Sequence, residues 1–146
     1  VQKSYLALVL GHPEWPGEVL LSHRLTDGEG FARRLARPDE PGETAETFVR
    51  VLRKGRWPAG GLEVALVEMR LVTGRRHQIR VQLSSAGHPV LGDAHYGGDP
   101  VMTYRMFLHS HRLVVPLPAG ASSTIEAPCS FPEELEVAPE LEPVPE

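Results

Sequence analysis

The hydrophobic period of this chain changes once, near its middle. Residues 62–71 (LEVALVEMRL) place apolar side chains on both alternating faces, as a central β-strand does. Beyond residue 73 the apolar residues Ile79, Leu83 and Ala86 recur at helical spacing, and Gly87 stands where a helix commonly ends. This stretch therefore predicts a strand followed by a short helix, with the helix opening at Thr73 or a neighbour.

The rest of the chain carries mostly strand patterns. We expect further strands at residues 3–10, 17–22, 45–54, 105–115 and 122–127. Gly- and Pro-rich segments predict loops or turns at residues 27–42, 57–61 and 92–98. Many strands with few helices predict an α+β fold, a mostly antiparallel mixed sheet with one or two short helices.

Length and composition are typical of a single globular domain. The chain has 146 residues, 41% hydrophobic and 23% charged, and no apolar run approaches the roughly 20 residues that span a membrane. We expect a folded part at residues 1–132 and an acidic, Pro-rich disordered tail at 133–146. One cysteine, Cys129, forms no internal disulfide, which fits a reducing compartment and predicts a cytoplasmic protein. Since Val1 is not a start methionine, we expect a processed product or a piece of a longer chain.

Positive charge gathers in one region of a mildly acidic chain. The formal net charge is −4, but six glutamates fall in residues 131–146, and residues 1–130 hold 15 basic and 13 acidic residues. Four of the 13 arginines lie between Arg70 and Arg80. Such clustering suits a local site for a polyanion, although composition alone favours a solvated charged face.

The predicted strand–helix corner concentrates these arginines. Gly74 is expected to let the backbone turn sharply, and a helix N-terminus attracts anions through its free N–H groups. Arg75, Arg76 and His77 fall at that end, and Arg80 lies one helical turn further on. The corner could hold a phosphate or pair with a carboxylate, and a purely structural salt-bridge corner is the alternative.

The string T-G-R-x-H-Q-I-R-V, followed by G-H-P-V-L-G-D-x-x-Y-G, resembles the C-terminal signature of RluA-type RNA pseudouridine synthases. Three shorter pieces match the family's K-x-Y-x-A, A-x-T-x-[Y/F] and L-H-[A/S] strands in the same order, at residues 3–7, 45–48 and 108–110. The resemblance covers residues 3–132 and implies the C-terminal portion of a pseudouridine synthase catalytic domain.

The resemblance also implies an activity, the isomerisation of uridine to pseudouridine in rRNA or tRNA, without a metal or other cofactor. By position, Tyr5 matches the family's active-site tyrosine, Arg80 the arginine that pairs with a nucleophilic aspartate, and Leu108 an apolar residue of the base pocket. Arg75, Arg76 and His77 are then expected near the RNA backbone. The implied partner is RNA, bound by a monomer with no membrane attachment.

The family's aspartate motif, H-R-L-D-x-x-T-S-G, is missing. His23-Arg24-Leu25-Thr26-Asp27 shares its first three letters but follows the K-x-Y strand, so Asp27 is interpreted as a loop residue. Asp93 is expected to brace the loop of the signature. Arg76 and Gln82 stand where the family usually has Thr or Ser and His. Three interpretations stay open: a fragment inactive alone, a non-catalytic RNA-binding module, or a chain completed by another.

Five histidines are candidate metal ligands: His77, His88, His95, His109 and His111. His109 and His111 share one face of the last long predicted strand, a spacing that two metal ligands can use. No acidic residue recurs beside them, so loop bracing and RNA contact are favoured and no metal is predicted.

Overall fold

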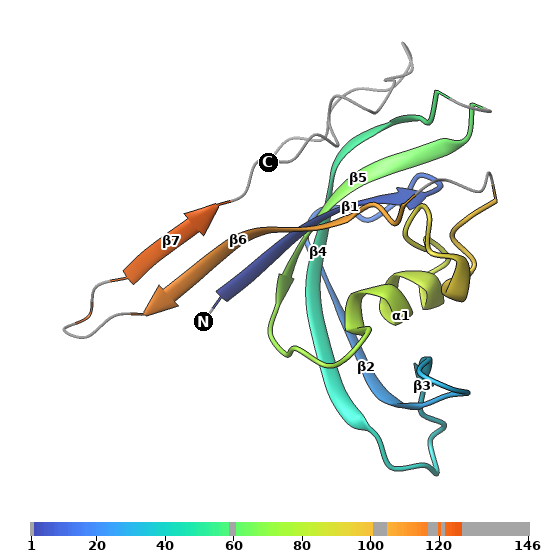
Figure 1. The fold of residues 1–146 in the computed structure, drawn as a ribbon, viewed down its shortest axis with the longest axis vertical. Coiled ribbons are helices and arrows are strands. Elements are labelled where there is room, and N and C mark those ends of the chain that lie inside the picture. Colours follow the sequence, from blue (N-terminus) through green and yellow to red (C-terminus); the bar gives the residue numbers. More distant parts are fainter. Residues whose placement is uncertain (1, 59–60, 101–104, 117–119, 121, 127–146) are drawn as a thin grey trace.

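The protein forms one seven-stranded sheet with a short helix on one face (Figure 1). The computed structural model describes residues 2–58, 61–100, 105–116, 120 and 122–126. The strand order is β3-β2-β4-β5-β1-β6-β7, and every described pair is antiparallel. The elements are β1 Gln2–Leu10, β2 Val19–Asp27, β3 Arg33–Leu35, β4 Glu43–Arg56, β5 Glu63–Leu71, α1 Gln78–Ser85, the 3₁₀ turn η1 Ala94–Tyr96, β6 Leu108–Pro116 and β7 Ser122–Glu126. The predicted α+β class is confirmed, and the expected boundary at residue 132 lies outside the described residues.

The two central strands, β1 and β5, are buried on both faces, as their sequences predict. In β1, Ala7 and Val9 join the core that α1 covers, while Leu6 and Leu8 join a second core on the opposite face. Helix α1 packs Ile79 and Leu83 into the first core. The β6–β7 hairpin instead projects away from the rest of the molecule (Figure 1).

The prediction for residues 17–42 was partly wrong. Strand β2 runs to Asp27, and the segment predicted as a loop contains the short strand β3. Asp27 is therefore a strand residue, paired with Arg33 across the β2–β3 ladder. The inward-facing polar residue His23 hid the period, although Leu25 further along β2 is fully buried. This extension matters because β2 and β3 reach the N-terminal end of α1.

The start of α1 also differs from the prediction. The helix begins at Gln78, and His77 precedes it in the left-handed region with φ 57°. Gly74 does not have a positive φ. The left-handed backbone before the helix is adopted by His77, where we had expected the sharp turn at Gly74. The other end agrees with the prediction, since Gly87 has φ 87° just after the helix.

A β-bulge interrupts the pairing of β1 with β6 beside Tyr5. Ser4 pairs with Arg112 and Tyr5 with Ser110, so β6 has one extra residue at this point. Bulges bend a strand and turn the neighbouring side chains, and they are frequent beside functional sites. Tyr5 and Leu108, on the two strands that this bulge joins, both pack against the core that α1 covers.

Candidate active site

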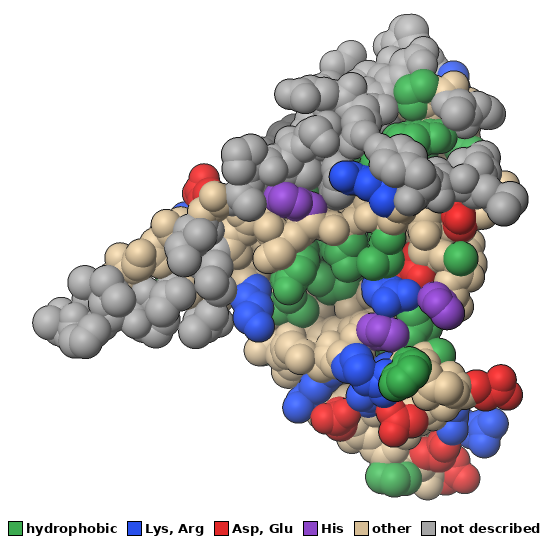
Figure 2. Space-filling model, in the orientation of Figure 1, with side chains coloured by type: hydrophobic (Ala, Val, Ile, Leu, Met, Phe, Trp, Pro, Cys, Tyr) green, Lys and Arg blue, Asp and Glu red, His purple; other side chains and the backbone are tan. Residues whose placement is uncertain are grey.

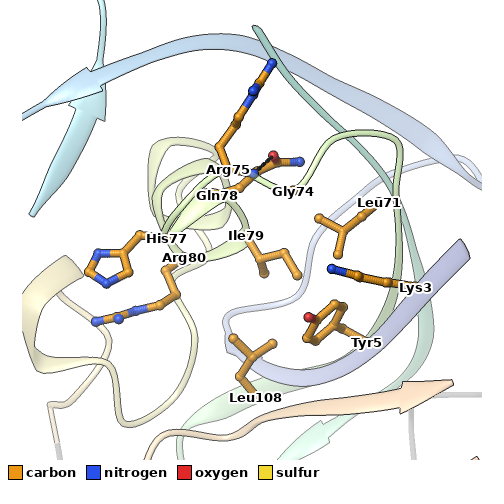
Figure 3. Close-up of a pocket in the computed structure, with 10 residues that line it drawn as sticks. All are labelled: Lys3, Tyr5, Leu71, Gly74, Arg75, His77, Gln78, Ile79, Arg80 and Leu108. Atoms are coloured by element: carbon orange, nitrogen blue, oxygen red, sulfur yellow. Dashed lines mark hydrogen bonds between the residues drawn. The ribbon is translucent and has the colours of Figure 1, made fainter. Parts of the chain in front are cut away.

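A hollow of about 210 Å³ lies between β1, the start of β6 and the N-terminal part of α1 (Figure 3). It contains five of the six predicted site residues: Tyr5, Arg75, His77, Arg80 and Leu108. The other lining residues are Lys3, Leu71, Gly74, Gln78 and Ile79. Figure 2 shows apolar side chains in the middle of this face, with Lys, Arg and His side chains around them. Segments from both ends of the chain thus form one partly apolar hollow with a cationic rim.

Tyr5, Leu71 and Leu108 provide apolar surface in the hollow. Each is partly buried and packs against the core that contains Ile79. Lys3 lies two residues before Tyr5 on the same strand and also lines the hollow. An aromatic ring with aliphatic neighbours suits a flat, weakly polar group such as a nucleobase.

Arg80 is held by Asp93 rather than directed at open solvent. Its Nε donates to Oδ2 of Asp93 at 2.9 Å and its Nη2 to Oδ1 at 3.0 Å, and the two side chains are 16% and 1% exposed. The hydrogen bond that Arg80 donates to Asp93 raises the pKa of Arg80 further above its usual value. Figure 3 shows the guanidinium extending toward His77 and away from the Tyr5 ring. Asp93 therefore braces the loop as predicted, but it does so through the predicted catalytic arginine.

His77 is fixed by a second pair across the same corner. Its Nδ1 lies 2.8 Å from the hydroxyl of Tyr96, which also accepts the backbone N–H of Arg33 at 2.9 Å. Because Tyr96 already accepts one hydrogen bond, we assign its own proton to His77 Nδ1, which leaves the ring's proton on Nε2. Burial, followed by the nearby charges of Arg80 and Arg76, lowers the pKa of His77, so the ring is neutral at pH 7.

The two arginines predicted to bind RNA are engaged with the protein. Arg75 donates from Nε to the carbonyl of Thr44 at 2.9 Å and lies 3.5 Å from Glu43. Arg76 donates to Asp27 at 2.9 Å and to the carbonyl of Phe31. Arg76 does not line the hollow and instead ties the β2–β3 loop to the start of α1.

The glycine-rich end of the signature permits a close backbone approach. At Gly98 an added Cβ would lie 1.9 Å from the carbonyl oxygen of Val90, so a side chain there would displace the backbone. Gly98 also pairs with Asp93 in an isolated bridge, which closes the loop that carries Asp93 and Tyr96. The loop therefore places Asp93 beside Arg80 and Tyr96 beside His77.

The sequence did not reveal the pairs Arg80–Asp93 and His77–Tyr96. All four residues belong to the quoted signature, so their joint presence was the available signal. The spacing gives no direct indication of contact, because the pairing depends on how the loop folds back over α1.

Two buried glutamines attach α1 to the sheet. Gln82 is fully buried and its Nε2 lies 3.0 Å from the carbonyls of Leu21 and Ala45 and from Nδ1 of His23, while its Oε1 accepts the Thr47 hydroxyl at 2.6 Å. Gln78 donates from Nε2 to the carbonyl of Glu46 at 3.0 Å and to the hydroxyl of Thr47 at 2.8 Å, both in β4. Gln82, which stands where the family usually has His, thus has a structural role, because its amide makes its hydrogen bonds inside the protein.

Among the residues that the structure describes, no three His, Cys, Asp or Glu side chains lie together as a metal site would need. No helix in that part of the chain is long and apolar enough to cross a membrane.

The fold and the hollow define a class of protein, an α+β domain whose site combines an aromatic ring, aliphatic side chains and a partly buried arginine. The family model for RNA pseudouridylate synthase matches residues 1–85. The chain therefore belongs to the RNA pseudouridylate synthase family, as the sequence signature indicated.

Individual relatives agree with this assignment. The dual-specificity RNA pseudouridine synthase RluA of Escherichia coli K12 is 34% identical over 133 residues, which cover 89% of this chain and 58% of RluA. The uncharacterized RNA pseudouridine synthase YhcT of Bacillus subtilis is 37% identical over 135 residues, 92% of this chain and 42% of YhcT. The structure of human RNA pseudouridylate synthase domain containing 1 superimposes with a TM-score of 0.78 at 31% identity, covering 89% of this chain and 55% of that one. This chain thus spans about half the length of these relatives.

Proposed function

We propose that the protein isomerises uridine to pseudouridine in RNA and that this chain forms the C-terminal portion of the catalytic domain. The observation that carries the proposal is the assembly of Tyr5, Arg80 and Leu108 around one hollow. They come from β1, α1 and β6, far apart in the sequence, and each was expected there from the family resemblance.

The hollow offers a nucleobase both contact surface and polarity. In our proposal an extruded uracil lies against the Tyr5 ring and the Leu108 side chain, since a base inside a helix is out of reach of any side chain. The Tyr5 hydroxyl is placed to exchange a proton with the base while it is detached and rejoined through carbon 5. Arg80 contributes positive charge that stabilises an ionised carboxylate at the sugar.

The attacking carboxylate is not among the residues that line the hollow. None of the ten is Asp or Glu, and both oxygens of Asp93 are bound by Arg80. Arg80 donates to Asp93 from Nε and Nη2, and we propose that its Nη1 donates to the nucleophilic carboxylate. We infer that this nucleophile comes from residues outside this chain, so that the chain alone is inactive.

The same observation favours one alternative, a non-catalytic RNA-binding module. A hollow that holds a base but has no carboxylate would bind RNA without reacting. The alternative predicts salt-dependent RNA binding by the whole protein with no conversion of uridine.

The substrate and setting follow from the proposal. We propose rRNA or tRNA as the substrate, a monomer as the active form, and the cytoplasm as the location. The relative RluA is named a dual-specificity RNA pseudouridine synthase, which supports testing more than one RNA substrate.

The test is pseudouridine formation by the whole encoded protein, mapped in ribosomal and transfer RNA from cells that lack the gene. We expect Arg80→Ala to reduce conversion by about 100-fold or more, and Tyr5→Phe, which removes one hydroxyl, to reduce kcat by a similar factor with KM nearly unchanged. The matched control is Leu20→Ala, an exposed apolar residue of β2 that does not line the hollow.

Because Arg80→Ala also leaves the buried Asp93 unpaired, each rate is normalised to folded protein. Wild-type conversion by folded Arg80→Ala and Tyr5→Phe proteins would refute the proposed function. RNA binding without any conversion by the wild type would select the binding module instead.

A further inference from the structure

A second hollow, of about 360 Å³, adjoins the first. It is lined by Glu29, Gly30, Phe31, Ala32, His77, Arg80, His95 and Tyr96. His77 and Arg80 line both hollows, so they form a shared wall. The second hollow therefore lies one side chain away from the proposed uridine position.

Phe31 is the most exposed large apolar side chain among the described residues, with 87% of its surface accessible. Phe31 lies on the loop between β2 and β3, and hydrogen bonds of the loop's backbone hold this loop in place. Gly28 N–H donates to the Ala32 carbonyl at 2.9 Å, Ala32 N–H donates to the Glu29 carbonyl at 3.0 Å, and Arg76 donates to the Phe31 carbonyl. The ring is thus presented to solvent by an ordered loop that is tied to the start of α1.

The chemistry of this hollow suits a neutral ring better than a phosphate. The charge of Arg80 is matched by Asp93, and Glu29 adds a carboxylate to the lining. Tyr96 carries the Arg80 guanidinium over its ring at 5.0 Å, and the Phe31 ring lies at the same hollow. With the ring proton of His77 assigned to Nε2, that nitrogen remains a hydrogen-bond donor. Two aromatic rings, a guanidinium plane and one donor together match a nucleobase.

We propose that this second hollow binds a nucleobase adjacent to the target uridine, with Phe31 as its stacking surface and His77 as its hydrogen-bond donor. The inference rests on the proposed function, because it places the target base in the first hollow. Extruding a uridine breaks its stacking with its neighbours, and an exposed aromatic ring next to the site replaces one of those contacts. The subsite would therefore hold the RNA open while the reaction proceeds.

The proposal is tested on the whole encoded protein with deproteinised ribosomal RNA and transfer RNA as probes. We expect Phe31→Ala to raise the Kd for the RNA that carries the target by about five-fold or more, the effect of losing one base–aromatic stack. Phe31→Trp, which keeps an aromatic face at this position, should restore the affinity. The loop survives these changes, because its hydrogen bonds come from the backbone and from Arg76.

Ultraviolet crosslinking with mass spectrometry provides a second readout. We expect a nucleotide adduct on the peptide that contains Phe31, while Leu20→Ala, the exposed control on β2, leaves both affinity and adduct unchanged. A Kd for Phe31→Ala within two-fold of the wild type, or adducts confined to other peptides, would overturn the proposal.

The outcomes for the two proposals are separable. If Arg80→Ala abolishes conversion while Phe31→Ala changes nothing, the second subsite fails and the proposed function stands. If folded Arg80→Ala and Tyr5→Phe proteins convert uridine as the wild type does, the proposed function fails. If the wild type binds no RNA, both fail.

Discussion

Asp93 and Arg80 form the most enclosed ion pair of the candidate site. Asp93 is 1% exposed at its side chain, and both of its oxygens accept hydrogen bonds from one guanidinium. A bidentate pair of this kind sets the direction of the arginine as well as its charge. The residue predicted to serve catalysis is therefore also a structural residue, and variants at this position report on both roles.

Removing the carboxylate tests the structural role. Asp93→Ala leaves the Arg80 charge partly buried without its partner, and we expect a loss of about 3 kcal/mol in the free energy of unfolding. Asp93→Asn keeps one acceptor and should lose less. Urea denaturation of both variants measures the difference. A loss below about 1 kcal/mol in Asp93→Ala would show that the pair contributes little.

Helix α1 is attached to the sheet by polar as well as apolar contacts. Ile79 and Leu83 enter the core, and Gln82 links the helix to backbone carbonyls of β2 and β4. With eight residues, such a helix has little stability of its own, so its position depends on these tertiary contacts. The positions of His77 and Arg80 depend on α1 in turn.

The buried amide of Gln82 can be removed without changing the side-chain size greatly. Gln82→Leu leaves the Leu21 and Ala45 carbonyls and the Thr47 hydroxyl without this partner, and we expect a loss of about 2 to 4 kcal/mol in unfolding free energy. Ser85→Ala is the control, because Ser85 is exposed at the end of the same helix. Equal urea midpoints for Gln82→Leu and the wild type would contradict this account.

At the scale of the whole molecule, the shifted histidines and glutamates among the described residues fall into two pH ranges. Burial lowers the pKa of His23 and His77 below the usual value of 6.5. Hydrogen bonds from arginines lower the pKa of Glu18 and Glu43, and those from Arg34 and the backbone of Arg37 lower that of Glu40 to about 2. The shifted histidines therefore make stability depend on pH near neutrality, and the shifted glutamates do so only in acid.

We expect stability to fall as the pH drops below about 6.5. In that range the unfolded chain protonates His23 and His77 while the folded protein resists, so the unfolded state binds more protons and stability rises with pH. The slope vanishes below the folded pKa values, and the glutamates add a second loss below about pH 4.5. Urea midpoints between pH 5 and 8 measure the first step. His23→Gln should reduce it, and an unchanged slope would contradict the assignment.

The central fold was predictable from local patterns. Strands β1, β4 and β5 carry continuous or alternating apolar residues, and Gly87 marks the end of α1 because only its positive φ completes the turn. Strand β3 and the extension of β2 were missed because polar residues dominate there and pairing with a neighbour decides their structure. The sheet order was likewise beyond local patterns, since it depends on contacts between distant segments.

The candidate site divides in the same way. Five of its predicted residues line one hollow, because the family resemblance carried positional information that composition lacks. Arg76 does not line it, since the β2–β3 loop engages its guanidinium. Neither Phe31 nor the pairing of Tyr96 with His77 was foreseen, because each depends on how two loops meet α1.

By itself, the sequence determined the family, the main strands, the short helix after β5 and the residues to examine, because period and motif are written along the chain. Tertiary structure alone decided which charges oppose each other. The Arg80 guanidinium turns to Asp93, and His77 takes a left-handed backbone to reach Tyr96. The physical reason is that a side chain's partner is set by the distance in space between folded segments, and spacing in the sequence does not encode it.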